Sequence, residues 1–468
     1  MQEEECAEYE ENGHMHHHPV AEYEENGCME HHHQSAEYEE NSEQYEDHLL
    51  EAKVELEENV LYDDEATIFE QNAHLMEIAQ MHQEGEEIDM KDCKDLELMD
   101  LNPATEIVIH AKGLQRRVWK KERSQAWWDR CNEPDFPEAE FHHAFRMSRA
   151  TFDHICEEIG PVVSKEDTML RQAIPVQQRV AVCLWRLSSG EPLRLLSKRF
   201  GLGISTCHKL VIEVCTAIND VLLPKYIHWP SHEHAQAIRE GFERVTGIPD
   251  IVGAIYTTHM PIIAPKVNVT SYFNRKHTER TQKTSYSLTL QGVVEAHGLF
   301  TDICIGWPGS YTDEHVLEKS ALYERGLSGF LHGDWVVGGP SYPPLDWLLS
   351  PYIQEHLTWT QHAFNERVEE ALKIARNAFT RLKGRWQYLT KRAEIKVQEL
   401  PTILGACCVL HNICEQLGEP FDPDLYIPIE DDDTPCEHMP WSQLSLERRE
   451  HIAHSFLHSM HSGIIPSL

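Results

Sequence analysis

Apolar residues follow a strand-like pattern in the second half of the chain. Beyond residue 247, short runs rich in β-branched residues alternate with turn residues, which is typical of strands. Strands are predicted at residues 251–256, 286–294, 299–306 and 335–337, with a helix around 313–323 and a long helix over about 365–386. Three successive strands, a helix, a fourth strand and a second helix indicate an α/β fold built on one sheet.

Residues 137–230 show the helical spacing of apolar positions instead. Ser148 can cap a helix that Gly160 and Pro161 would end, and a second helix is expected after Pro175. The C-terminal end also predicts a helix, at residues 445–460, whose apolar stripe could dock on the core or on a partner. The first half of the folded chain is therefore expected to be all-helical.

Residues 192–210 carry a sharper pattern. A short helix from Pro192 should end near Gly201, and a new helix capped by Ser205 should follow a tight turn, which is helix-turn-helix organisation. The residues that would meet a DNA groove and its phosphates are Ser205, Thr206, His208, Lys209, Arg194, Lys198 and Arg199. Residues 111–230 hold 18 basic and 14 acidic side chains, a mild positive balance. The alternative is a helical domain that only packs on its neighbour.

The first hundred residues have a very different composition. They contain 33 acidic and 3 basic side chains, and a six-residue motif beginning at Ala7 recurs at 21–26 and 36–41. Such dense like charge with few aliphatic residues predicts a disordered tail. Histidine runs at 16–18 and 31–33 could bind a transition metal loosely, although repeat expansion in an unconstrained tail is the simpler interpretation.

Cysteine usage and hydropathy limit the environment and the partners of the chain. Neither a secretory signal nor a membrane span is expected, and the 13 cysteines include no Cys-x-x-Cys pair, which favours a reducing compartment. Cys408, His411 and Cys414 have helical spacing, but their apolar surroundings favour a core helix over a zinc site. A basic cluster at 116–123 could serve as a nuclear import signal or as a phosphate-contacting arm.

Several motifs occur in a fixed order between residues 145 and 418. They include Gly253-Ala254-Ile255-x-x-Thr258-His259, Trp307-Pro308-Gly309-Ser310-x-x-Asp313, Tyr342-Pro343-x-Leu345-x-Trp347, Leu382-Lys383-Gly384-Arg385-Trp386 and Leu410-His411-Asn412. Through these motifs the chain resembles the PIF/Harbinger transposase-derived nuclease family, and its domesticated plant members in particular. The resemblance implies an RNase-H-like DDE transposase core, a metal-dependent DNA nuclease fold.

The resemblance also suggests how the chain is divided. An acidic disordered tail with repeats is expected at residues 1–110 and a helical domain with the helix-turn-helix pattern at 111–235. The RNase-H-like, Harbinger-type DDE domain would occupy 236–418, and an acidic segment with a short helix would follow at 419–468.

The three positions where active family members carry metal-binding carboxylates match Tyr256, Gly339 and Arg376 in this chain. A two-metal nuclease needs hard oxygen ligands for Mg²⁺, and these residues supply no carboxylate. We therefore expect no catalytic residues and no bound metal. Arg376 would stand partly in place of the missing cations and pair with a nearby acid, for which Asp313, an acid that the family shares, is one candidate.

Four other acids are candidate replacements for the missing metal ligands. Asp334 should face the other side of its strand, Glu369 lies about 10 Å along the helix from Arg376, and Asp302 and Glu295 would need a changed strand register. Basic sets remain on the long helix with its extension and at 275–283. They are interpreted either as retained phosphate contacts or as solvated, salt-bridged surface.

The leading functional hypothesis is a domesticated, catalytically inactive transposase relative that acts in the nucleus as a chromatin-associated scaffold. The resemblance implies a separate Myb/SANT-like DNA-binding protein and a Polycomb-type chromatin complex as partners, and DNA as a further ligand. One alternative is an active DNA endonuclease that uses Mg²⁺ or Mn²⁺. The other is a sequence-specific DNA-binding regulator that uses the helix-turn-helix.

Overall fold

The computed structural model describes residues 124–169, 172–331, 333–393, 395–429, 435–436 and 442–461, with side chains up to residue 456. The predicted acidic tail at 1–110, the basic cluster at 116–123 and the acidic run at 430–433 lie outside the described residues. One long apolar segment, Val397–Gln416, could cross a membrane by length and composition, but 78% of its apolar window is buried in the protein. In this fold it forms a core helix.

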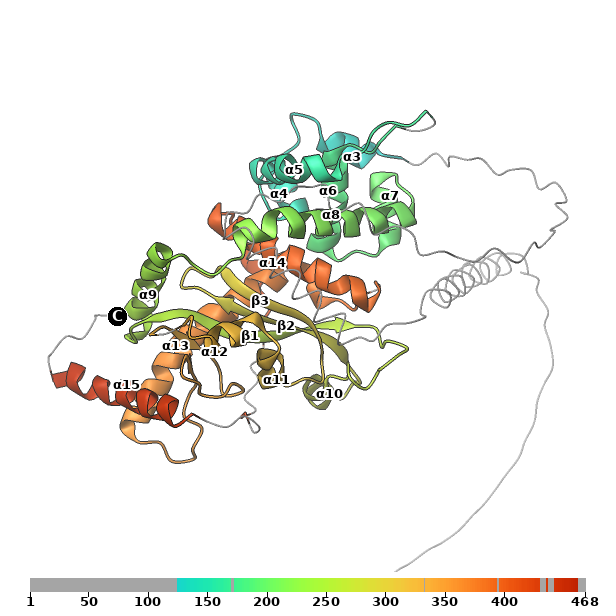
Figure 1. Ribbon diagram of the computed structural model, residues 1–468. Coiled ribbons are helices and arrows are strands. Elements are labelled where there is room, and N and C mark those ends of the chain that lie inside the picture. The colour runs from blue at the N-terminus through green and yellow to red at the C-terminus, as the bar shows by residue number, and fades with distance from the viewer. Residues whose placement is uncertain are drawn as a thin grey trace, which may run out of the picture. The chain divides into compact units, whose positions relative to one another are not determined.

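The first part of the described chain is helical, as expected (Figure 1). Its helices are α3 (Ala126–Cys131), α4 (Glu138–Phe145), α5 (Arg149–Val163), α6 (Val176–Ser189), α7 (Leu193–Phe200), α8 (Ile204–Tyr226) and α9 (His232–Thr246). Ser148 caps α5 by accepting a hydrogen bond from the Thr151 amide. The helix does not end at Gly160, however, but continues through Pro161 to Val163.

Gly201 ends α7 in the left-handed conformation, and α8 then leaves at an angle of 97°. The predicted cap at Ser205 is wrong. The second helix begins at Ile204 with Gly203 at its N-cap, so Ser205 already lies inside the first turn. The predicted domain boundary between residues 235 and 236 falls inside α9.

A mixed five-stranded sheet forms the second part, in the order β3-β2-β1-β4-β5. The strands are β1 (Ile251–Ile262), β2 (Tyr286–Val294), β3 (Phe300–Pro308), β4 (Trp335–Val337) and β5 (Leu348–Leu349). β2 pairs antiparallel with both β1 and β3, whereas β4 runs parallel to β1 and β5. This mixed α/β architecture fits the DDE endonuclease fold that the resemblance implies.

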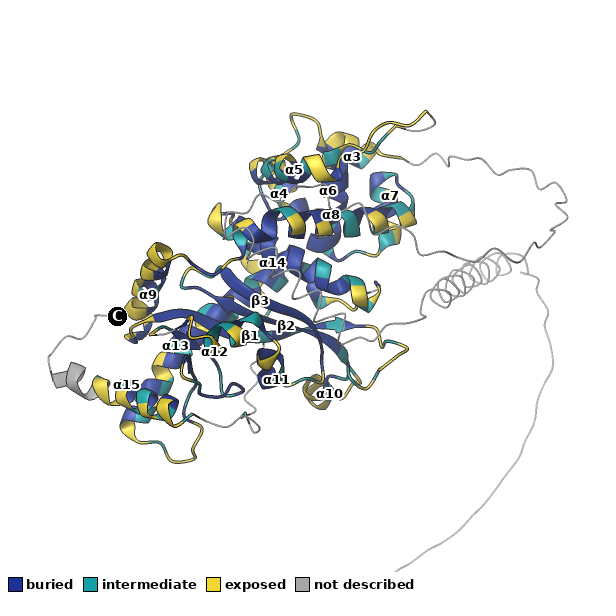
Figure 2. Ribbon diagram, viewed as in Figure 1, coloured by how far each residue is buried: buried dark blue, intermediate teal, exposed yellow. Residues whose placement is uncertain are grey.

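Helices cover both faces of the sheet, so β2 and β3 are buried along almost their whole length (Figure 2). One face packs against α13 (Trp359–Arg385) and α14 (Leu400–Gln416), and the other packs against α11 (Asp313–Glu318) and α12 (Ala321–Leu327). The capping box of Thr358 and Gln361 starts α13 earlier than expected. The remaining helices are α10 (Arg275–Thr281), η2 (Gln387–Thr390), η3 (Val397–Glu399), η4 (Pro423–Leu425) and α15 (Gln443–His461).

One hydrophobic core runs from the helical part into the sheet. α14 lies between α8 and β3, and buried Asn412 on α14 joins both. Its side-chain amide donates to the carbonyls of Tyr226 (2.7 Å) and Phe300 (2.8 Å), and its carbonyl accepts from the Phe300 amide (2.9 Å). Cys408, His411 and Cys414 are buried on the same helix, as expected for a core helix. The helical part and the sheet therefore pack as one unit.

Candidate functional site

Tyr256, Gly339 and Arg376, the three triad positions where the family carries carboxylates, lie on β1, just after β4 and on α13, the helix that packs on β1. Ala254 on β1 pairs with Val337 at the end of β4, so two residues further along these parallel directions Gly339, just past β4, lies beside Tyr256 in the middle of β1. The buried Tyr256 ring packs against Phe379 on α13, with 5.4 Å between ring centroids. Arg376 lies three residues before Phe379 on the same helix, about 4.5 Å along its axis. Strand pairing thus relates two of the three positions directly, and the third lies on the helix that packs against Tyr256.

The side chains at this site differ from those of a metal centre. A side chain added at Gly339 would meet nothing within 4 Å of its Cβ, so the position has room for a carboxylate that the chain does not carry. The Tyr256 phenol fills the space on β1, and Arg376 brings a cation. In the described part of the chain, no three His, Cys, Asp or Glu side chains gather in a cluster that could hold a metal. These residues do not fit the divalent ions that a DDE nuclease requires.

Arg376 forms an ion pair with Glu369, at 3.0 Å between Nη1 and Oε1. The two residues lie about 10 Å apart along the helix axis, but their long side chains reach each other across that separation. Arg376 is 22% and Glu369 is 44% exposed, so solvent screens this pair. Glu369 is thus a partner of Arg376 that sequence analysis missed. The sequence feature that could have indicated the pair is the spacing of seven residues, which places both side chains on the same face of α13.

Asp313, the acid proposed to pair with Arg376, lies in a separate buried cluster. Its Oδ2 accepts a hydrogen bond from the Ser341 hydroxyl at 2.6 Å, and Thr257 and Lys276 also interact with it. Burial raises the pKa of Asp313, and these neighbours partly oppose the shift. The Tyr342 hydroxyl, 2.6 Å from Thr257 Oγ1, belongs to the same cluster. Because Thr257 and Tyr256 are consecutive strand residues, they point to opposite faces of β1.

The three remaining replacement acids are engaged away from the triad positions. Asp334 forms a two-armed pair with Arg239 on α9, at 2.7 and 3.0 Å. Asp302 pairs with Arg325 on α12, and burial raises the pKa of Asp302 to about 6. Glu295 lies 3.0 Å from His234 on α9. Each carboxylate therefore has a structural partner on a helix outside the site.

The seven residues proposed to contact DNA lie on α7 and the start of α8 but differ in their availability. Arg194, Lys198, Ser205 and Lys209 are exposed, whereas Thr206, His208 and Arg199 are partly buried. His208 lies 3.2 Å from Glu399, and Lys209 lies 3.8 Å from Glu213.

Arg199 has a packing role inside the helical part. Its guanidinium lies over the rings of Trp185 and Trp127, at 4.0 and 5.0 Å, and 3.8 Å from Glu191. Sequence reasoning could not see this, because the two tryptophans come from α3 and α6.

Much of the basic set on the long helix is used within the fold. Buried Arg385 donates to the Arg146 carbonyl and to Glu415, and Arg381 also binds Glu415. Partly buried Lys383 donates to the His259 carbonyl at 2.8 Å, and desolvation of its ammonium group lowers the pKa of Lys383 to about 8. These contacts favour the structural interpretation of these three residues over phosphate binding.

The comparisons with known proteins agree with this geometry. Residues 255–412 match the family model described as DDE superfamily endonuclease. The Arabidopsis thaliana protein named Antagonist of Like Heterochromatin Protein 1 is 32% identical over 332 residues, which cover 64% of this chain and 80% of that protein.

Two further relatives extend this picture. An Arabidopsis protein named ALP1-like is 31% identical and covers 62% of this chain and 75% of its own length. The human protein named "Putative nuclease HARBI1" is 26% identical, and the match covers 62% of this chain and 81% of that protein. No solved structure matches the chain. The resemblance drawn from the motifs is confirmed.

Proposed function

Because this chain belongs to the Harbinger-derived family of DDE superfamily endonucleases, we propose that it is a domesticated member that has lost nuclease chemistry and acts as a binding scaffold in chromatin. The observation that carries the proposal is the triad site itself, where a phenol, a glycine and a guanidinium occupy the carboxylate positions. Loss of three acids removes the negative charge that gathers Mg²⁺, and Arg376 adds a positive charge in its place.

The preserved packing around the site supports a binding role. Tyr256 and Phe379 fill the space between β1 and α13, and Asn412 joins the helical part to the sheet. In this proposal, replacement of the catalytic acids leaves the packing of the fold intact. A transposase fold that no longer cleaves DNA can still bind the proteins that its ancestors bound.

The partners follow from the family. The name of the Arabidopsis relative describes an antagonist of a heterochromatin protein, which supports association with a chromatin complex. We propose a nuclear location, a Myb/SANT-like DNA-binding protein as one partner and a Polycomb-type complex as another. DNA contact through Lys198 and Lys209 is a further part of this proposal, since both side chains are exposed.

Affinity purification of the full chain from nuclei tests the scaffold proposal. We expect a Myb/SANT-like protein and chromatin subunits to be recovered at salt concentrations that remove DNA-mediated contacts. The triple change Tyr256→Phe, Gly339→Ala and Arg376→Gln serves as the matched variant. It should recover the same partners, because the proposal gives the old catalytic site no chemical role. Recovery of unrelated cytosolic proteins alone would contradict the proposal.

A further inference from the structure

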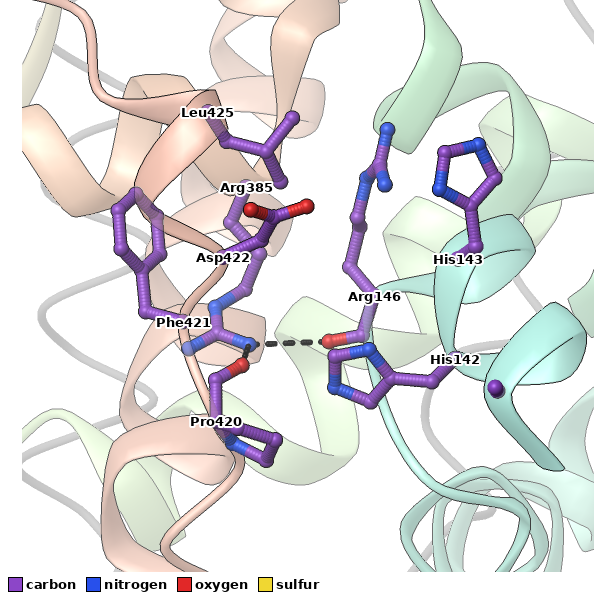
Figure 3. Close-up of a pocket in the computed structure, with 9 residues that line it drawn as sticks. His142, His143, Arg146, Arg385, Pro420, Phe421, Asp422 and Leu425 are labelled. Atoms are coloured by element: carbon purple, nitrogen blue, oxygen red, sulfur yellow. Dashed lines mark hydrogen bonds between the residues drawn. The ribbon is translucent and has the colours of Figure 1, made fainter.

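A cavity of about 190 Å³ opens between α4, the end of α13 and the segment that leads into η4 (Figure 3). It is built from elements other than β1 and β4, which carry Tyr256 and Gly339. Its polar lining consists of His142, His143, Arg146, Arg385 and Asp422, and the Phe421 ring forms part of its apolar wall. Two arginines and two histidines around one cavity give it the composition of an anion site.

Arg146 is the unusual group in this cavity. The residue is 8% exposed, and its Nε is buried without a hydrogen-bond partner. Among the described residues, none makes a hydrogen bond or an ion pair with its guanidinium. The backbone holds it there, since Arg146 adopts a left-handed conformation (φ 63°) with its amide bound to the His142 carbonyl at 2.7 Å. A buried guanidinium whose Nε lacks a hydrogen-bond partner is costly, and an anionic ligand that binds it directly would offset that cost.

Arg385 forms the wall of the cavity. Its Nη1 donates to the Arg146 carbonyl at 2.9 Å, and its Nη2 donates to Glu415 Oε1 at 3.1 Å and to the Glu419 carbonyl at 3.3 Å. These bonds fix Arg385 and leave Arg146 as the group that can turn toward a ligand. The positive charge of Arg385 adds to the attraction.

Asp422 is the acid that faces Arg146 across the cavity (Figure 3). It influences Arg146 electrostatically, but its Oδ1 is engaged as the cap of η4, where it accepts from the Asp424 amide at 3.0 Å. A ligand must therefore outcompete one tethered carboxylate. A phosphate monoester does so, because it carries up to two negative charges and three acceptor oxygens, which an arginine can bind in a two-armed fashion.

The surroundings of the cavity select among phosphate sources. Exposed Glu138 and Glu140 flank Ala139 on α4, and Asp424 follows Asp422 on the other side. An acidic rim repels the many charges of nucleic acid but attracts basic side chains next to a single phosphate. The phosphate of a phosphodiester is linked to the rest of the nucleic acid on both sides, whereas this small cavity suits a phosphate at the end of a side chain. We propose that this cavity binds a phosphoserine or phosphothreonine side chain of a protein partner, flanked by basic residues.

Fluorescence anisotropy of the full chain with a labelled peptide tests the proposal. The probe is a short peptide with one phosphoserine between arginines, and the same peptide without phosphate controls for attraction to the acidic chain, whose formal net charge is −37. We expect the phosphate to strengthen binding by about tenfold, the effect of one charge-assisted pair. Inorganic phosphate should compete for the site. Equal affinity of the two peptides would overturn the proposal.

Three variants locate the effect. Arg146→Gln should abolish the phosphate-dependent difference, with thermal unfolding showing that the fold persists. Asp422→Asn keeps the cap oxygen and removes the competing charge, so it should strengthen phosphopeptide binding by several-fold. Arg244→Gln, which removes an exposed arginine on α9, should change nothing. A phosphate effect that survives Arg146→Gln, or tighter binding of a 5′-phosphorylated oligonucleotide than of the peptide, would overturn the assignment.

Discussion

Asn412 gives the sharpest prediction of stability, because one buried side chain satisfies three backbone groups. Its amide and carbonyl bind the Phe300 amide, the Phe300 carbonyl and the Tyr226 carbonyl at 2.7–2.9 Å. Asn412→Ala leaves all three groups buried and unpaired, and each unsatisfied group costs about 1–3 kcal/mol. Allowing for partial relaxation, we expect the free energy of unfolding to fall by about 3–6 kcal/mol, a large part of a typical total.

Urea unfolding followed by circular dichroism measures this loss. Asn412→Asp keeps the acceptor for the Phe300 amide but removes both donors, so it should also destabilise the protein. Gln236→Ala, an exposed change on α9, is the control and should shift the free energy of unfolding by about 0.5 kcal/mol or less. A loss below about 1 kcal/mol in Asn412→Ala would refute the claim that this residue holds the helical part to the sheet.

Three further changes test other parts of the account. Burial lowers the pKa of His411 to about 4, so the unfolded chain takes up the extra proton and stability falls as pH drops from about 6.5 to 4. His411→Gln should reduce the slope of the unfolding free energy against pH by one proton, about 1.4 kcal/mol per pH unit, as measured by urea unfolding at several pH values. An unchanged slope would contradict this prediction. Gly201→Ala should cost about 2 kcal/mol in thermal unfolding, because φ is +64° and the new Cβ would lie 2.8 Å from the Ser124 carbonyl. Arg199→Ala should destabilise the fold by about 1 kcal/mol through its lost contacts with Trp185, whereas Lys209→Ala should weaken only DNA binding in a gel-shift assay; the reverse pattern would restore Arg199 as a phosphate contact.

The sequence predicted those elements whose signal is local. Apolar periodicity located β1 to β4 and the long helix, and glycine chemistry located the turn at Gly201. β5, with two residues, was too short to leave a pattern. The cap at Ser205 was misplaced because Gly203 can occupy an N-cap without any side-chain signal.

The candidate site was predictable where a motif fixes a position and unpredictable where tertiary contacts decide. The motifs located Tyr256, Gly339 and Arg376, and strand pairing then brought the first two together. The stacking of Arg199 and the cavity around Arg146 depend on residues from several distant segments. A single sequence carries no signal for such contacts.

Loss of the metal site is the central claim, and Mg²⁺-dependent DNA nicking tests it most directly. Supercoiled plasmid is incubated with the full chain and Mg²⁺, an ion that prefers oxygen ligands and so avoids the histidine runs at 16–18 and 31–33. The account predicts no nicking above the level of a metal-free sample. Mg²⁺-dependent nicking that Asp313→Ala or another single acid-to-alanine change abolishes would contradict it and identify a working endonuclease.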